Sequence, residues 1–276
     1  MQDSEEKSKI PEEVELGNAK VKVMHPSILN VLKKRQHVKE RLAQVKHKIG
    51  IYSAKGGVGK TTVAINIAFA LKGLGFTVGL VDADIDCPNL MMFLGMKDRA
   101  EGRYPLVPAE KEGVKVISTA MFVDDSKTPI IWRGPMVAKM VSDFFENTEW
   151  GALDYLIIDL SPGTSDSPLS IMQLLELDGF VLVTTPQHIP AINTVRSGMM
   201  ARRLGVSVLG VVENMSDGKA RGGKEVADEL KCDLIGTVKL NPKLGELSDS
   251  GKIPVFEDNE IKEEFISIVK KLIKGD

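Results

Sequence analysis

The 276-residue chain contains only two cysteines, Cys87 and Cys232, and no CxxC pair. Two thiols so far apart in the sequence support neither a disulfide framework nor a metal site within one chain. The four histidines are too scattered to suggest a metal-binding set. No run of eighteen apolar residues occurs, and the first residues are charged and polar. We therefore expect no membrane-spanning helix and no secretory signal, and we expect the protein to be cytoplasmic.

An excess of charge of one sign is also lacking. The 36 Lys and Arg residues nearly balance the 38 Asp and Glu residues, which leaves a formal net charge of −2. This balance predicts no global attraction to nucleic acid or to anionic lipid, so we expect neither specific nucleic acid binding nor membrane association. Aliphatic and aromatic residues together still reach 43%, which is enough to build a core.

The composition changes near residue 26. The first 26 residues are rich in Glu, Lys and Ser and poor in large apolar groups, which predicts a disordered tail over residues 1–26. Residues 27–276 are predicted to form one domain. Apolar residues at helical spacing predict amphipathic helices over residues 28–45 and 261–273.

Short apolar runs alternate along the domain with segments long enough for helices. Runs that are apolar on both faces are typical of a parallel sheet covered by helices on both sides, which binds ligands at the carboxyl ends of its strands. The predicted fold is therefore α/β, with a doubly wound and mostly parallel sheet. The predicted strands lie at residues 49–53, 77–81, 114–118, 155–158, 179–183 and 208–212.

A glycine-rich loop follows the first of these strands. Residues 54–62 read AKGGVGKTT and precede an apolar helical stripe at 63–71. The glycines let successive N–H groups turn toward an anion, and the helix adds its positive N-terminal end. We expect Lys60 to reach the β- and γ-phosphates of a nucleotide and the Thr61 hydroxyl to bind Mg²⁺. The predicted nucleotide-binding residues of this loop are Gly56, Gly57, Val58, Gly59, Lys60, Thr61 and Thr62.

One position departs from the general phosphate-loop pattern GxxxxGK[ST]. Ala54 stands where that pattern has glycine. The alternative interpretation is a glycine-rich turn with an incidental lysine. The strand before the loop, the helix after it and two downstream carboxylate motifs favour the phosphate loop.

The first carboxylate motif follows the second strand, where residues 82–89 read DADIDCPN. Three acids at a strand end need donors, water or a cation around them and are not expected to share a core. Asp84 is predicted to orient the attacking water, because its strand lies beside the phosphate loop. For Asp86, an Asp-rich turn is an equal alternative.

The second motif is an apolar strand that ends in an acid, at residues 156–164, LIIDLSPGT. This is the Walker B arrangement. Asp159 is expected to hold Mg²⁺ through a water molecule. Gly163 is expected to bring a backbone N–H close to the γ-phosphate and so to sense its loss.

Together these motifs resemble the Mrp/NBP35 family of iron–sulfur cluster carrier P-loop ATPases, within the larger ParA and MinD superfamily. The resemblance covers nearly all of residues 45–270. Beyond the loop and the Walker B stretch it includes WRGPMV at 132–137, VTTPQ at 183–187 and VENMS at 212–216. It implies an ATP-dependent homodimer that binds an iron–sulfur cluster and passes it on.

The resemblance also assigns residues. KGGVGKTT is similar to the deviant Walker A signature, in which Lys55 crosses into the partner subunit's nucleotide and stabilises charge on the transferred phosphoryl group. It implies catalytic roles for Lys55, Lys60 and Asp84. It further implies that adenine is contacted by Asn214 and by Val238, Lys239 and Leu240. The stretch at 214–217, NMSD, lacks the lysine of the guanine-reading NKxD motif, which favours ATP over GTP.

One departure concerns the cargo. Members of the family place a CxxC pair shortly after the segment matching residues 213–216, whereas residues 217–224 here read DGKARGGK. A typical cluster takes four thiolates. The sequence therefore predicts that this chain alone holds no stable iron–sulfur cluster and works with a cysteine-bearing partner or client. The alternative function is a ParA- or MinD-like partition or positioning ATPase that acts on DNA, membrane or a protein partner.

Overall fold

The computed structural model describes residues 13–16, 19–22, 26–85, 87–98, 105–122, 134–163 and 166–274. Within them, an eight-stranded sheet has the order β10-β9-β8-β3-β7-β4-β6-β5. All neighbouring strands are parallel except β5, which pairs antiparallel with β6. The predicted α/β fold with a mostly parallel sheet is confirmed. The strands are β3 (Val45–Tyr52), β4 (Val78–Ala83), β5 (Ala109–Lys111), β6 (Val114–Ser118), β7 (Leu153–Leu160), β8 (Gly179–Thr184), β9 (Val208–Ser216) and β10 (Leu234–Lys239).

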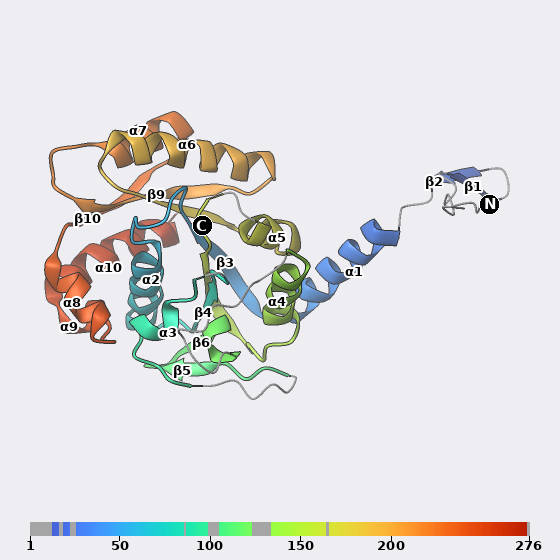
Figure 1. Ribbon diagram of the computed structural model, residues 1–276, viewed down its shortest axis with the longest axis horizontal. Coiled ribbons are helices and arrows are strands. Elements are labelled where there is room, and N and C mark those ends of the chain that lie inside the picture. The colour runs from blue at the N-terminus through green and yellow to red at the C-terminus, as the bar shows by residue number, and fades with distance from the viewer. Residues whose placement is uncertain are drawn as a thin grey trace, which may run out of the picture.

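Helices cover both faces of this sheet (Figure 1). One face carries α2 (Lys60–Gly73), α9 (Pro254–Glu257) and α10 (Asn259–Lys274), with α3 (Leu90–Phe93) and α8 (Pro242–Asp249) beside them. The opposite face carries α1 (Pro26–Arg41), α4 (Gly134–Glu146), α5 (Asp166–Leu174), α6 (His188–Arg203) and α7 (Gly222–Leu230). A short 3₁₀ turn, η1 (Thr119–Phe122), follows β6. None of the helices in the described ranges is both long and apolar enough to cross a membrane.

Two of the central strands, β4 and β8, are buried along their whole length, because helices cover both of their faces. The register then places the site, since Asp159 of β7 pairs with Ile51 of β3 on one side and with Asp82 of β4 on the other. The carboxyl ends of these three strands therefore meet at one edge of the sheet, as parallel α/β folds require for a ligand site.

Two local predictions differ from the structure. The helix predicted over residues 28–45 ends at Arg41, and Val45 is already the first residue of β3. Val38 and Leu42 are both buried, so the apolar spacing that suggested one helix continues across the turn at residues 42–44. Strands β5 and β10 were not predicted, because β5 is short and β10 alternates buried and exposed residues.

The predicted disordered tail contains a short hairpin. Strands β1 (Glu13–Leu16) and β2 (Ala19–Lys22) pair antiparallel, in disagreement with the prediction for those residues. The backbone register pairs Glu13 with Lys22 and Leu16 with Ala19. The rest of the 1–26 segment lies outside the described residues, apart from Pro26 at the start of α1, and the division at residue 26 stays a prediction.

Candidate functional site

The phosphate loop leaves β3 and enters α2 through two glycines in the left-handed region, Gly57 with φ 81° and Gly59 with φ 78°. Residues with a Cβ rarely adopt this conformation. At Gly59 an added Cβ would also lie 2.1 Å from Nδ2 of Asn214. That amide donates to the Val58 carbonyl at 2.9 Å. Gly59 is therefore required both by the turn and by the close approach of Asn214 from β9.

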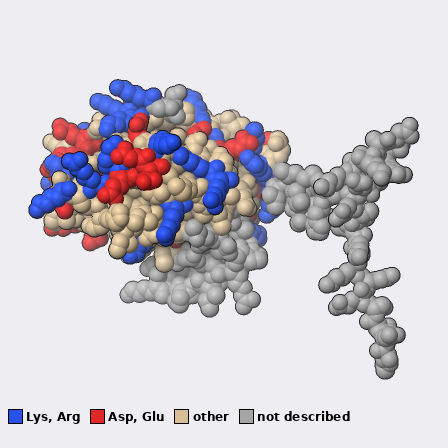
Figure 2. Space-filling view, turned by 90° about the horizontal axis from the view of Figure 1, so that it is seen from above, with Lys and Arg blue, Asp and Glu red and all other residues tan. Residues whose placement is uncertain are grey.

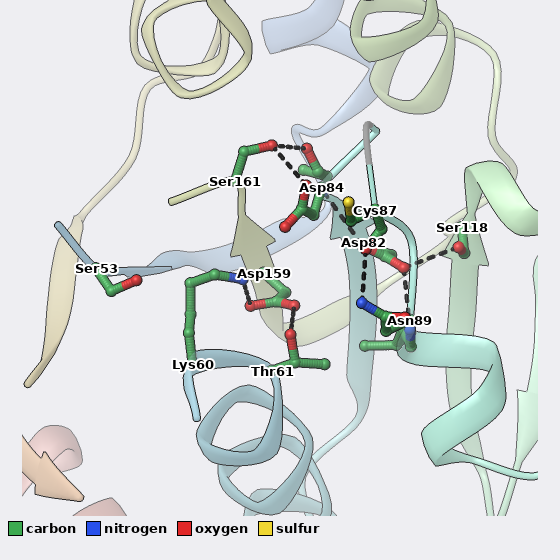
Figure 3. A network of polar contacts seen from close by, with 12 residues as sticks. Ser53, Lys60, Thr61, Asp82, Asp84, Cys87, Asn89, Ser118, Asp159 and Ser161 are labelled. Atoms are coloured by element: carbon green, nitrogen blue, oxygen red, sulfur yellow. Dashed lines mark hydrogen bonds and ion pairs between the residues drawn. The ribbon is translucent and has the colours of Figure 1, made fainter. Parts of the chain in front are cut away.

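Lys60, Thr61 and Asp159 meet at the start of α2 (Figure 3). The Lys60 ammonium lies 2.6 Å from Oδ1 of Asp159, and both side chains are buried, with 6% and 1% exposure. The Thr61 hydroxyl donates to Oδ2 of the same carboxylate at 2.6 Å. A buried carboxylate is stable only when it is paired and hydrogen-bonded in this way. The Thr61 and Asp159 oxygens form a hard-oxygen donor pair, which fits Mg²⁺.

Asp84 follows β4 and lines the same cavity as Lys60. The Ser161 hydroxyl, just after β7, lies 3.1 Å from Oδ1 of Asp84 and 3.3 Å from the Ala83 carbonyl oxygen (Figure 3). Partial burial raises the pKa of Asp84 above its ordinary value, while the charge of Lys60 opposes that rise. Asp84 thus sits at the cavity with its orientation fixed by Ser161.

Asp82 of the three-acid motif is buried, with 1% exposure, whereas Asp84 is partly exposed. Its carboxylate accepts from Ser118 at 2.9 Å, from the Leu90 N–H at 3.1 Å and from the Asp84 N–H at 3.2 Å. These donors supply what burial of a carboxyl group requires. Burial, together with the nearby charge of Asp159, raises the pKa of Asp82 to about 7.

This raised pKa predicts a pH dependence of stability. Between its unfolded pKa of 3.8 and its folded pKa of about 7, Asp82 binds more protons in the folded state than in the unfolded state. The free energy of unfolding therefore falls as pH rises through this window. In EDTA and without nucleotide, we expect the free energy of unfolding to fall about 2–3 kcal/mol less between pH 5 and pH 8 in Asp82→Asn than in the parent protein. Urea unfolding of both proteins at the two pH values measures this difference.

Asp154→Asn is the control for this experiment. Hydrogen bonds from Lys46 and Thr77 hold the pKa of Asp154 below its usual range, so its contribution is lost only on acidification. That variant should keep the parent's difference in stability between pH 5 and pH 8. Equal pH dependence in Asp82→Asn and the parent protein would refute the assignment to Asp82.

The phosphate loop borders a cavity of about 490 Å³. Of the predicted loop residues, Val58 is buried behind the lining, with 5% exposure. Lys55 is exposed at the cavity, whereas Asp159 and Gly163 lie outside its lining. The lining consists of Ser53, Lys55, Gly56, Gly57, Gly59, Lys60, Thr61, Thr62, Asp84, Cys87, Asn89, Phe93, Ser161 and Pro162.

A second cavity of about 260 Å³ adjoins the first, because Thr62 and Phe93 line both. It is bordered by Asn214, Lys239 and Leu240 of the predicted adenine set. The Asn214 Oδ1 atom is buried and has no hydrogen-bond partner among the described residues. The two cavities together can accommodate an elongated ligand, with the phosphate loop at one end, Lys239 and Leu240 at the other, and Asn214 beside the loop.

The rest of the predicted adenine set is less suited to a base. Val238 is 1% exposed and belongs to the core, so it does not line the second cavity. The backbone N–H of Leu240 donates to the Ser216 carbonyl at 3.0 Å and is already used. The Lys239 ammonium pairs with Glu260 at 2.6 Å. The alternation of β10 explains Val238, because neighbouring residues of a strand face opposite sides of the sheet.

The two cysteines lie far apart. Cys87 is exposed and follows the carboxyl end of β4, whereas Cys232 is half-buried and precedes the amino end of β10. Five strand spacings separate β4 from β10, which is about 24 Å across the sheet. Burial also raises the pKa of the Cys232 thiol. The described part of the chain contains no group of three or more His, Cys, Asp or Glu residues suited to a metal ion.

Several residues of the site had no role assigned from the sequence. Ser161 orients Asp84, Ser53 and Tyr52 bond to Gly163, and Phe93 joins the two cavities. Tyr52, Ser53 and Ser161 lie within or directly beside a recognised motif, and that position was the signal available for them. No feature of the neighbouring sequence marks Phe93. Asp86 and residues 132–133 of the WRGPMV segment lie outside the described residues.

A sequence profile of the ParA family, described as the NUBPL iron-transfer P-loop NTPase, matches residues 44–273. The chain belongs to this family. A relative named iron-sulfur cluster carrier protein from Methanocaldococcus jannaschii is 40% identical over 255 residues, covering 86% of this chain and 87% of the relative. One of the same name from Aquifex aeolicus is 38% identical over 252 residues, covering 85% and 69%. The resemblance to the cluster carrier ATPases is confirmed.

Solved structures of this NTPase class agree with the fold. A nucleotide-binding protein in complex with ADP from Archaeoglobus fulgidus matches with a TM-score of 0.70 and 32% identity, covering 84% of this chain and 96% of that chain. The cell division ATPase MinD of Pyrococcus furiosus matches with a TM-score of 0.65, 23% identity and coverage of 83% and 99%. The second likeness supports the fold alone.

Proposed function

We propose that this protein is an ATP-hydrolysing nucleotide switch of the iron–sulfur cluster carrier type, which acts as a homodimer. The observation that carries the proposal is the convergence of Lys60, Thr61 and Asp84 at one cavity beside a phosphate loop, with the buried Asp159 bonded to Lys60 and Thr61. The similar nucleotide-binding protein from Archaeoglobus fulgidus was solved in complex with ADP, which supports the binding of a nucleotide in this cavity.

Binding of the triphosphate rests on the loop and on Lys60. The N–H groups at the start of α2 carry the positive end of the helix dipole toward the phosphates. When the nucleotide binds, the β- and γ-phosphates replace part of the pairing between the Lys60 ammonium and Asp159. Thr61 and Asp159 would hold Mg²⁺, which when bound neutralises charge on the phosphate oxygens.

Asp84 orients the water that attacks the γ-phosphate. It lies at the cavity wall, and Ser161 fixes the direction of its carboxylate. A raised pKa makes it a better proton acceptor than an exposed aspartate, provided that it remains ionised beside Lys60. Gly163 senses the γ-phosphate through its N–H, which here donates to the Ser53 carbonyl at 2.9 Å.

The base is adenine, held in the second cavity. The unpaired Oδ1 of Asn214 is an acceptor, which suits the exocyclic amino group of adenine. Guanine carries an oxygen at the corresponding position, and two acceptors would face each other. Lys239 and Leu240 border the same cavity, whereas Val238 contributes only through the core.

Lys55 acts across the dimer. It is exposed at the cavity that Lys60 lines, so its ammonium can reach beyond its own subunit. In the proposed deviant Walker A arrangement, two subunits enclose the nucleotides and each donates Lys55 to its partner. A cation at that position stabilises the charge that develops on the transferred phosphoryl group.

The iron–sulfur cluster is a cargo that this chain alone does not hold. Cys87 and Cys232 lie at opposite ends of strands about 24 Å apart across the sheet, so one subunit offers one thiolate to any single cluster. A bridging cluster takes two thiolates from each subunit. We therefore propose that a cysteine-bearing partner or client supplies the ligands and that ATP turnover controls its binding.

The surface over α6 and α7 does not favour the partition or positioning alternative. Figure 2 shows this face, on which Lys and Arg are interleaved with Asp and Glu. Arg196, Arg202 and Arg203 are exposed on α6, and Glu225 and Asp228 are exposed on α7, which packs against α6. A DNA-binding face instead gathers charge of one sign.

The expected result of anaerobic reconstitution with iron and sulfide is a protein that hydrolyses ATP but retains no cluster after desalting. Iron, acid-labile sulfide and visible absorbance measure the cluster, and phosphate release measures hydrolysis. The Methanocaldococcus jannaschii relative, treated in parallel, is the positive control. Near-stoichiometric iron and sulfide that both disappear in Cys232→Ser would refute the proposed division of labour. Absence of ATP hydrolysis would refute the proposed ATPase activity.

A further inference from the structure

Tyr52 is a buried polar residue of the site region for which the proposed chemistry has no role. It is the last residue of β3, directly before Ser53 and the phosphate loop, and its exposure is 0%. Its ring packs against Phe180 of β8, with ring centroids 5.4 Å apart. Its hydroxyl donates to the carbonyl of Gly163. Tyr52 therefore connects the strand that leads into the phosphate loop with the loop that follows the Walker B strand.

Both backbone polar groups of Gly163, its N–H and its carbonyl, are hydrogen-bonded at the end of β3. Its N–H donates to the Ser53 carbonyl at 2.9 Å, and its own carbonyl accepts from Tyr52. Its φ of 75° lies in the left-handed region, which glycine adopts without strain. The start of the same loop is bound elsewhere, because Ser161 bonds to Asp84 and to the Ala83 carbonyl.

While Gly163 is in this position, its N–H cannot also sense the γ-phosphate. A single N–H that is fully engaged by Ser53 cannot also donate a strong hydrogen bond to a γ-phosphate. If Gly163 senses the γ-phosphate, the loop needs two positions, one bound to β3 and one bound to the nucleotide. Such a loop is a two-position element whose equilibrium the γ-phosphate shifts.

We propose that the Tyr52 hydroxyl is a latch that holds Gly163 on β3 until a γ-phosphate draws it away. Tyr52 is thus a positioning residue that sets how strongly the protein distinguishes ATP from ADP. The proposal rests on the proposed function, because it takes the ligand to be a nucleoside triphosphate. ADP has no γ-phosphate and leaves the latch closed.

The latch predicts the effect of Tyr52→Phe, which keeps the ring and its packing against Phe180. Loss of the hydrogen bond to the Gly163 carbonyl shifts the equilibrium toward the open position, and the hydrogen bond between the hydroxyl and Ser197 of α6 is lost as well. We expect affinity for a non-hydrolysable ATP analogue with Mg²⁺ to rise about 2- to 10-fold, with affinity for ADP unchanged. Isothermal titration calorimetry of both ligands measures the ratio of the two affinities.

Tyr155→Phe is the matched control. Tyr155 is also a buried tyrosine on a central strand, but it lies toward the amino end of β7, away from the cavity. Its variant should leave the ratio at the value of the parent protein. Hydrogen exchange gives a second measurement, because the Gly163 amide, which is bonded to the Ser53 carbonyl, should exchange faster in Tyr52→Phe without nucleotide.

The outcomes separate the latch from the proposed function. A higher ratio in Tyr52→Phe alone supports the latch. An unchanged ratio would overturn it, and so would equal weakening of both ligands, which would make Tyr52 a purely structural residue. Failure of the unaltered chain to bind either nucleotide would overturn the proposed function and the latch with it.

Discussion

Lys55→Ala is expected to bind ATP with nearly unchanged affinity and to hydrolyse it about 10³- to 10⁵-fold more slowly. The Lys55 side chain is exposed at the rim of the cavity, so its removal leaves the buried contacts of the loop intact. In the proposed dimer, the variant loses the positive charge that the partner subunit's nucleotide would meet in the transition state. Calorimetry with ATP and a phosphate-release assay, run on the same preparation, separate binding from turnover.

Lys60→Ala is the comparison variant for this prediction. Lys60 is buried and bonded to Asp159, and its ammonium is the cation expected at the β- and γ-phosphates. Its removal should abolish tight nucleotide binding. Because Asp159 then loses a buried partner, thermal unfolding should accompany the measurement. Equal loss of binding in Lys55→Ala and Lys60→Ala, with both proteins folded, would contradict a role of Lys55 across subunits.

Asp84→Asn is expected to bind ATP and Mg²⁺ and to hydrolyse ATP about 10²- to 10⁴-fold more slowly. The amide keeps the size of the side chain and can still bond to Ser161, but it neither orients the water as an anion nor accepts its proton. Slow hydrolysis should trap the ATP-bound dimer, which light scattering measures as a doubled mass. A monomeric mass for the variant under conditions in which the parent protein dimerises would count against this role.

The main sheet could be predicted from sequence because its strands are buried on both faces. The segment at 179–183, GFVLV, is an apolar run that includes two β-branched residues, and such runs are typical of central parallel strands. β10 follows a different rule, since its Thr237 and Lys239 are exposed while Val238 is buried. Its parallel pairing with β9 depends on a neighbour that is distant in the sequence.

The phosphate loop and the Walker B acid could be predicted because each is defined by residues adjacent in the chain. The contacts that orient them could not, because they join segments far apart in sequence. Ser161 and Asp84 are 77 residues apart, and Asn214 and Val58 are 156 apart. The close approach of Asn214 to Gly59 likewise follows only from the order of the strands.

The burial of Asp82 depends on donors that could not be identified from the sequence. The three-acid segment indicated only that its carboxylates need donors, water or a cation around them, because unpaired carboxylates are costly in a core. The fold supplies Ser118 from β6 and the N–H of Leu90 at the start of α3. Neither donor could be assigned from the sequence, since one depends on strand order and the other on the path of the loop.

Mixing Lys55→Ala with Asp84→Asn tests the central claim most directly, because each variant lacks a different part of the composite site. In a mixed dimer, the Lys55→Ala subunit keeps its own Lys60 and Asp84 and receives Lys55 from its partner. Subunits combined without nucleotide and then given ATP should recover about a quarter of the parent rate, because half of the dimers are mixed and each has one complete site. A rate that stays at the sum of the two separate variants would contradict the shared nucleotide site, and with it the proposed dimeric switch.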